Sequence, residues 1–138
     1  MVPAPEDMVD EVRIHSGTHV KLRQFGPGEI PEDFLRRLQE FAHGERQIEA
    51  IYLFGLQPEH DEEHVALVLA LKGGLFANKS EEFLRLVDEI QMLLPPDLPV
   101  NVYRFGASEL VSGFCLQTVE PVYLRSADWV ERQRKKRR

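Results

Sequence analysis

The stretch V-A-L-V-L-A-L, residues 65–71, is apolar at every position. A strand with one face in water alternates apolar and polar residues, whereas a strand covered on both faces reads as a continuous apolar run. Gly73 and Gly74 follow and break the run. The stretch therefore predicts a strand in the centre of a sheet.

A second strand is predicted at Ala50–Leu56, and a polar turn with the letters H-D-E-E-H, residues 60–64, separates the two strands. The zinc motif H-E-x-x-H needs a helix, which brings two histidines onto one face, and a glutamate at its second position. Here the second position is Asp61, the segment is a turn, and no third ligand is evident. The sequence predicts no metal site and no cofactor.

Two alternating runs flank residues 16–18 and predict a β-hairpin. A three-residue loop puts apolar residues opposite each other on one face, and it places two histidines opposite each other on the other face. Two facing histidines make at most a weak metal site. The predicted pairs are Ile14 with Val20, Val12 with Leu22, and His15 with His19.

Two helices are predicted, one from Pro31 to Gly44 with an apolar stripe at helical period, and one beginning at Ser80 and ending before Pro95-Pro96. The second helix should bury a stripe of four residues. These are Phe83, Val87, Ile90 and Leu94. A further strand is predicted at Val100–Phe105, a short helix or turn at Ser108–Leu116, and an extended segment at residues 120–124.

This order predicts an α+β fold, an antiparallel sheet with a split βαβ core (βαββαβ, ferredoxin-like) and its helices on one face. A hairpin strand is added at the N-terminus and a further strand at the C-terminus. We expect a flexible segment at residues 1–10, a single domain at 11–130 and a disordered basic tail at 131–138.

The charge of the chain is unevenly distributed. The net charge is −6, yet six of the 17 lysines and arginines lie in the last seven residues, which leaves 11 basic against 23 acidic side chains elsewhere. An acidic body repels nucleic acid, so weak contact with nucleic acid or another polyanion is expected only through the tail. The basic residues of the tail are Arg132, Arg134, Lys135, Lys136, Arg137 and Arg138.

Composition also bears on location and chemistry. The longest apolar run is far too short to span a bilayer, so we expect no membrane association. The acidic, proline-punctuated N-terminus is unlike a signal peptide, and a single cysteine fits a reducing cytosol. That residue, Cys115, lies in an apolar context that favours burial over reactivity. No catalytic set of residues is evident, so we expect no enzyme.

The segment G-P-G-E-I-P, residues 26–31, has ligand-binding potential because it leads from a strand into a helix N-terminus, where free amides attract anions. Gly26 and Gly28 would let a ligand approach the backbone closely, with Glu29 beside them. The alternative is a tight turn that needs glycine.

Five segments between about Gly17 and Arg125 form a recognisable series: I-P-E-D-F-L-R-R-L, I-E-A-I-Y-L, V-A-L-V-L-A-L, L-P-V-N-V-Y and V-E-P-V-Y-L-R. Through these segments the chain resembles the C-terminal domain of bacterial enhanced-serine-sensitivity (SseB-type) proteins. The resemblance implies a cytoplasmic bacterial protein linked to serine tolerance, and it supplies no catalytic residues.

Our leading hypothesis is a non-enzymatic protein-binding or regulatory module. Its partner, or a second copy of the chain, would bind on the sheet face that the helices leave open. The alternative is an amino-acid-sensing domain that uses the Gly26–Gly28 loop, by loose analogy with ACT domains.

Overall fold

The structure is a computed structural model that describes residues 9–15, 18–73 and 79–136. The order of its elements is β1 (Val9–His15), β2 (Thr18–Arg23), α1 (Glu32–Gly44), β3 (Ile48–Pro58), β4 (His64–Leu71), α2 (Lys79–Gln91), β5 (Val100–Arg104), α3 (Glu109–Gln117), β6 (Tyr123–Leu124) and α4 (Ala127–Lys136). The α+β class is confirmed.

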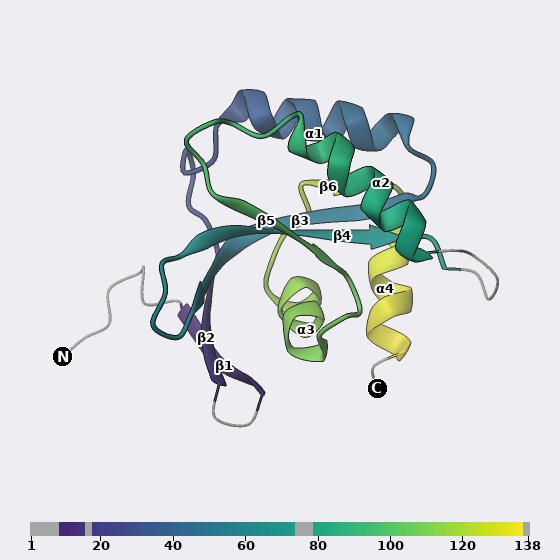
Figure 1. Ribbon diagram of the computed structural model, residues 1–138. Helices are drawn as coiled ribbons and strands as arrows, with labels where there is room; N and C mark the ends of the chain where they lie inside the picture. Colours follow the sequence, from purple (N-terminus) through teal and green to yellow (C-terminus); the bar gives the residue numbers. More distant parts are fainter. Residues whose placement is uncertain (1–8, 16–17, 74–78, 137–138) are drawn as a thin grey trace.

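The strands form one mixed sheet in the order β1-β2-β3-β4-β5, with β6 also paired to β3 (Figure 1). All neighbours are antiparallel except β4 and β5, which are parallel because the chain returns over one face through α2. In a split βαβ unit another strand lies between the two strands that a helix joins. Here β4 and β5 are direct neighbours, so the predicted ferredoxin-like topology and purely antiparallel sheet are wrong.

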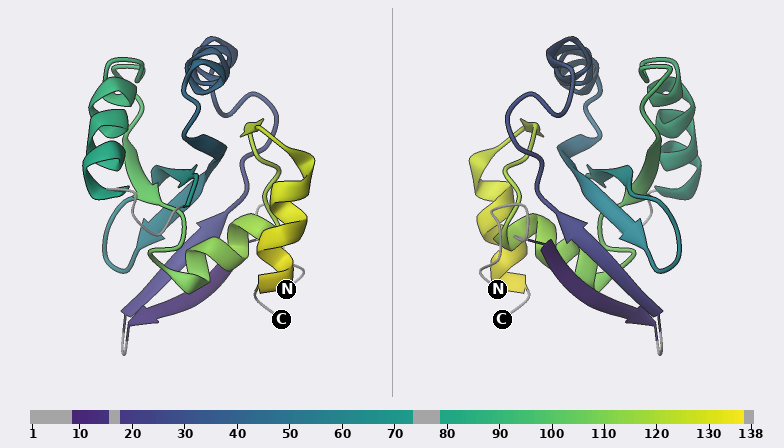
Figure 2. Two further views of the ribbon diagram at one scale, coloured as in Figure 1. Left: turned by 90° about the vertical axis from the view of Figure 1, so that its right-hand side faces the viewer. Right: turned by 90° about the vertical axis from the view of Figure 1, so that its left-hand side faces the viewer.

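Helices cover both faces of the sheet. Helices α1 and α2 lie on one face, and α3 and α4 lie on the other (Figures 1 and 2). Alternate residues of β4 feed the two cores: Leu67 and Leu69 pack under α1 and α2, whereas Ala66 and Val68 pack under α3 and α4. The prediction of β4 as a central strand is confirmed, and the prediction of helices on one face only is wrong.

The hairpin β1–β2 forms, but with a different register from the predicted one. Val12 pairs with Val20 and Arg13 with His19, and the register shifts between Arg13 and His15. This irregularity absorbs one residue, so His15 lies opposite Thr18 and not opposite His19. Val20 is buried as expected, as is Leu22. The side chains of residues 9–19 lie outside the part of the structure that is described, so the face on which the two histidines lie stays a prediction.

The two predicted long helices form. Helix α1 spans Glu32–Gly44, one residue shorter at its start than expected, and buries Phe34, Leu38 and Ala42. In α2 the fully buried side chains are those of Leu86 and Ile90, so the buried face is rotated relative to the predicted stripe. The short helix α3 begins as predicted, with the Ser108 hydroxyl accepting a hydrogen bond from the Val111 amide at 3.3 Å.

The predicted disordered tail is wrong for residues 131–136, which form the greater part of α4. The helix is anchored by Trp129, which is buried, and by Arg134, which donates from Nε and Nη2 to the carbonyl oxygen of Leu116 at 3.1 and 2.6 Å. These tertiary contacts offset the repulsion of the basic run. Residues 137–138 lie outside the described part, as do residues 1–8 of the expected flexible N-terminus, whereas residues 9–10 belong to β1. None of the described helices combines the length and apolarity that a membrane span needs.

Candidate functional site

One edge of β3 is shared by two different strands. Strand β2 pairs with β3 from Gly55 to Pro58, and β6 pairs with it only at Ala50 and Ile51. Leu53 lies between these two pairings, where neither β2 nor β6 reaches it. The sheet edge is therefore interrupted at Leu53.

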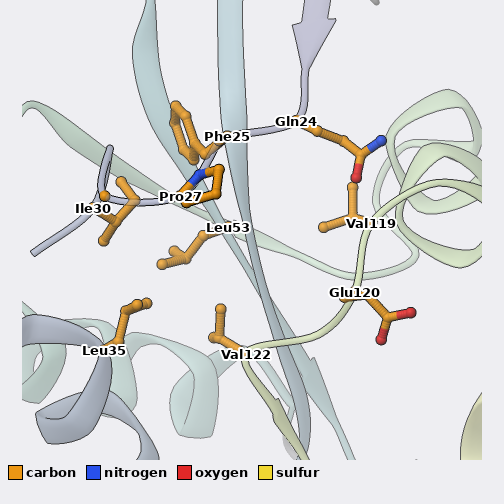
Figure 3. Close-up of a pocket in the computed structure, with 11 residues that line it drawn as sticks. Gln24, Phe25, Pro27, Ile30, Leu35, Leu53, Val119, Glu120 and Val122 are labelled. Atoms are coloured by element: carbon orange, nitrogen blue, oxygen red, sulfur yellow. The ribbon is translucent and has the colours of Figure 1, made fainter. Parts of the chain in front are cut away.

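A pocket of about 230 Å³ occupies this interruption (Figure 3). Leu53 lies between two segments that come from opposite ends of the fold, residues 24–30 after β2 and residues 119–122 before β6 (Figure 3). The lining is mainly apolar, and the polar side chains of Gln24 and Glu120 lie on one side of it. The lining residues are Gln24, Phe25, Gly26, Pro27, Gly28, Ile30, Leu35, Leu53, Val119, Glu120 and Val122.

The loop predicted as a ligand site forms one wall of this pocket. Gly26 and Gly28 both line it, and Gly28 has φ +82°, a backbone conformation that glycine adopts without strain. The amide of Glu29 donates to the carbonyl of Gly26 at 3.2 Å, which closes a tight turn. The loop is therefore a glycine-dependent turn that borders a pocket, and ligand binding by it stays a prediction.

Glu29 has a structural position and does not line the pocket. Its carboxylate accepts a hydrogen bond from the Gly26 amide and forms an ion pair with Arg23 at 3.0 Å. The hydrogen bond from the Gly26 amide, with the neighbouring guanidinium, lowers the pKa of Glu29 below its ordinary value. The amide that was expected to attract an external anion is thus occupied by the loop's own carboxylate.

Arg23 holds the loop against the rest of the sheet. Its guanidinium forms a two-point ion pair with Glu63 in the β3–β4 turn and lies over the Phe25 ring, 5.2 Å from the ring centre. The hydrogen bonds to Glu63 raise the pKa of Arg23, so the guanidinium stays charged at every pH of interest. One wall of the pocket is therefore tied to the turn that contains H-D-E-E-H.

The opposite wall, residues 119–122, was missed by the sequence analysis. It is fixed by the amide of Val122, which donates to the Ile51 carbonyl at 2.8 Å, and by Gln39 of α1, whose side-chain amide donates to the Val122 carbonyl at 2.9 Å. The local signal was V-E-P-V, with two apolar residues around a proline. That signal marks an extended segment but does not reveal that it lies beside the glycine loop.

The H-D-E-E-H segment is a turn, as predicted. His60 is exposed and has φ +65°, and His64 is the first residue of β4. The Nε2 atom of His64 lies 2.8 Å from the Tyr103 hydroxyl, and burial lowers the pKa of this imidazole. Within the described residues, no group of three or more histidine, cysteine, aspartate or glutamate side chains is placed to hold a metal ion. Cys115 of α3 is fully buried in the core between this helix and the sheet, in agreement with its predicted burial.

The basic residues of the C-terminal segment have different positions. Arg134 is bound to the Leu116 carbonyl, whereas Arg132 and Lys136 line a cleft between α4 and the end of β4. Lys135 lies on α4 but does not line that cleft. The last two arginines lie outside the described residues.

Comparison with known protein families matches residues 14–125, most of the chain, to the SseB protein C-terminal domain. No curated protein and no solved structure matches the chain. The family match agrees with the resemblance seen in the core segments of the sequence, from the first helix to the closing V-E-P-V-Y-L-R. The chain thus belongs to the SseB protein C-terminal domain family.

Proposed function

We propose that the protein is a non-enzymatic protein-binding or regulatory module that holds one apolar side chain of a partner in the pocket at the edge of β3. The observation that carries this proposal is the apolar pocket at Leu53, where β2 and β6 leave the sheet edge interrupted. The sheet faces are not candidates for this role, because helices cover both of them.

The size and chemistry of the pocket support a side chain as its occupant. Small-molecule sites usually enclose about 300–1,000 Å³, and this pocket of about 230 Å³ falls below that range. Protein interfaces concentrate their binding energy in a few large side chains that enter such apolar pockets. A leucine, methionine or phenylalanine of a partner fits this description.

Charge favours a partner with basic residues next to that anchor. Gln24 and Glu120 lie beside the pocket (Figure 3), and the whole chain has a net charge of −6. A lysine or arginine next to the apolar anchor would lie near the Glu120 carboxylate. Such complementarity at the rim raises the association rate and the specificity more than the affinity.

The family match bears on the cellular location and pathway of this module, and not on its binding site. Membership of the SseB C-terminal domain family is consistent with a bacterial cytoplasmic protein and with a connection to serine tolerance, which we include in the proposal.

The alternative function is amino-acid sensing at the same pocket, and the fact that Gly26 and Gly28 line it favours this alternative. A free amino acid would also have to place its α-carboxylate. The Gly26 amide already donates to Glu29. The loop therefore has fewer free hydrogen-bond donors for the α-carboxylate of an amino acid than the sequence suggested.

The two functions are separated by NMR titration of the labelled protein with N-acetyl-leucinamide and with free leucine. If the pocket takes a partner side chain, the capped compound shifts the resonances of residues around Leu53, weakly, because burying one leucine side chain contributes only about 1.5–3 kcal/mol. Free leucine should bind no more tightly than the capped compound, since no described group of the pocket is placed to bind both of its charges. Tight binding of free leucine with no response to the capped compound would favour amino-acid sensing and contradict the proposal.

A further inference from the structure

A second concave site lies between α4 and the ends of β4 and β5. Helix α4 passes beside the end of β4 (Figure 1), and the cleft between them measures about 510 Å³. It shares no lining residue with the pocket at Leu53. The lining residues are Glu49, Leu71, Lys72, Gly73, Phe105, Gly106, Trp129, Arg132, Gln133 and Lys136.

Three cationic side chains from two separate parts of the chain line this cleft. Lys72 follows β4, while Arg132 and Lys136 lie one helical turn apart on α4. None of the three forms an ion pair or a side-chain hydrogen bond with another described residue, even though the chain holds 23 acidic against 17 basic side chains.

Several other cations of the described chain do have carboxylate partners. Arg23 is bound to Glu63 and Glu29, and Arg85 is bound to three carboxylates. Like charges four residues apart on a helix repel each other, so Arg132 and Lys136 gain nothing from their spacing in the absence of an anion. Unpaired cations gathered at one cleft are the arrangement expected of an anion-binding site.

We propose that this cleft binds a small ligand with a phosphate or other multiply charged anionic group. Arg132 offers the planar fork that suits phosphate oxygens, and the two lysines add point charges. The volume lies within the range of small-molecule sites. Trp129 and Phe105 give the cleft an apolar wall, against which the uncharged part of such a ligand can pack.

Glu49 is the carboxylate among the lining residues, and it reduces the net charge of the lining from three positive charges to two. The remaining surplus of positive charge still favours an anion.

The proposed site also changes the role expected for the basic C-terminal segment. Two of its residues line a defined cleft and Arg134 holds the helix, so in this proposal these residues have specific roles instead of a diffuse attraction to polyanions.

The test is isothermal titration calorimetry of the full chain with inorganic pyrophosphate as the probe. We expect saturable one-to-one binding that weakens at least about tenfold in the Arg132→Gln/Lys136→Gln double variant, because two charge-assisted contacts are lost. Lys135→Gln is the control, since it removes one positive charge from the same helix outside the cleft, and it should leave binding within about twofold of the wild type. Pyrophosphate that does not bind, or binding that Lys135→Gln weakens as much as the double variant does, overturns the proposal.

A second arm uses single-stranded oligouridylate to separate a small anion from nucleic acid. For a discrete small-anion cleft, we expect the oligonucleotide to bind no more tightly than pyrophosphate does, and we expect pyrophosphate to displace it. Tighter binding of the oligonucleotide, to which Lys135 contributes equally, would show a general nucleic-acid attraction along α4. That result contradicts the proposed cleft.

Discussion

Arg23 and Glu63 form a two-point ion pair that joins the loop after β2 to the turn between β3 and β4. The Nε atom of Arg23 donates to Oε2 at 3.0 Å, and Nη2 donates to Oε1 at 2.8 Å. Gly55 leaves room for this pair, since a Cβ atom there would lie 2.7 Å from Glu63 Oε2. The position of one pocket wall therefore depends on a contact 40 residues away in the chain.

The Arg23–Glu63 pair should show measurable coupling in a double-mutant cycle of Arg23→Met and Glu63→Gln. Both side chains are partly buried, so we expect a coupling free energy of about 1 kcal/mol in chemical denaturation. The exposed pair of Asp33 and Arg37 is the control and should couple by less than about 0.5 kcal/mol. Equal coupling in the two pairs would show that Arg23 does not organise the loop.

Arg134 should contribute to stability although it lies in a basic run. Its two hydrogen bonds to the Leu116 carbonyl satisfy an acceptor in the last turn of α3, and its partial exposure reduces their value, so Arg134→Ala should cost about 1 kcal/mol. Lys135→Ala removes the same charge from the same helix and should change the unfolding free energy by less than about 0.5 kcal/mol. If both variants melt like the wild type, α4 is not held by Arg134.

Replacing Trp129 tests whether α4 packs on the sheet. It is only 5% exposed and packs against Tyr52 and Phe105, so Trp129→Ala should cost about 3–5 kcal/mol in chemical denaturation. The control is Leu84→Ala on α2, where the side chain is 61% exposed and truncation should cost less than about 0.5 kcal/mol. If Trp129→Ala lowered the unfolding free energy only slightly, that result would contradict the packing of α4 on the sheet and support the open sheet face that the sequence suggested.

His64 should make stability depend on pH. Burial lowers its pKa in the folded state, and the neighbouring carboxylates of Asp61 and Glu63 only oppose this shift. The unfolded chain therefore binds a proton more readily, so this contribution is complete above about pH 6.5 and is lost as the pH falls through the folded-state pKa. Denaturation curves at about pH 7.5 and about pH 5.5 should differ less for His64→Gln than for the wild type. An equal difference in the two proteins would contradict this assignment.

Residues whose signal is local were predicted well from the sequence. The unbroken apolar run of β4 predicted its central position, and the stripe from Phe34 to Ala42 predicted α1. Pro31 and Gly44 predicted the bounds of this helix to within one residue. The same run also indicated that both sheet faces are covered, because a strand without polar positions has no face for water. The predicted open face was inconsistent with that signal.

Features that depend on distant contacts were not predictable in the same way. The hairpin register rests on an irregularity between Arg13 and His15, which an apolar count cannot detect. The four basic residues among 131–136 repel each other in isolation, and the packing of Trp129 and the bond from Arg134 to Leu116 help to hold their helix. In the helix, tertiary contacts outweigh the local preference.

One of the two walls of the candidate pocket could be predicted from the sequence. The G-P-G turn identified Gly26 and Gly28, because glycine and proline mark such loops by themselves. Residues 119–122 could not be assigned to the same site, since nothing local in V-E-P-V shows that β6 ends its pairing with β3 just short of Leu53.

Selection of a displayed random-peptide library on the protein tests the central claim, that the pocket at Leu53 anchors a partner side chain. Val119→Phe, which fills the pocket from its rim, serves as the counter-selected variant. Val87→Phe, at a partly buried valine of α2 that does not line the pocket, is the matched control, and thermal denaturation verifies that both variants fold.

We predict that the enriched peptides share one large apolar residue beside a lysine or arginine, and that they bind Val87→Phe as well as the wild type. Their affinity for Val119→Phe should fall at least about tenfold, the effect of losing one buried anchor. Peptides that bind Val119→Phe and the wild type equally well would contradict the account.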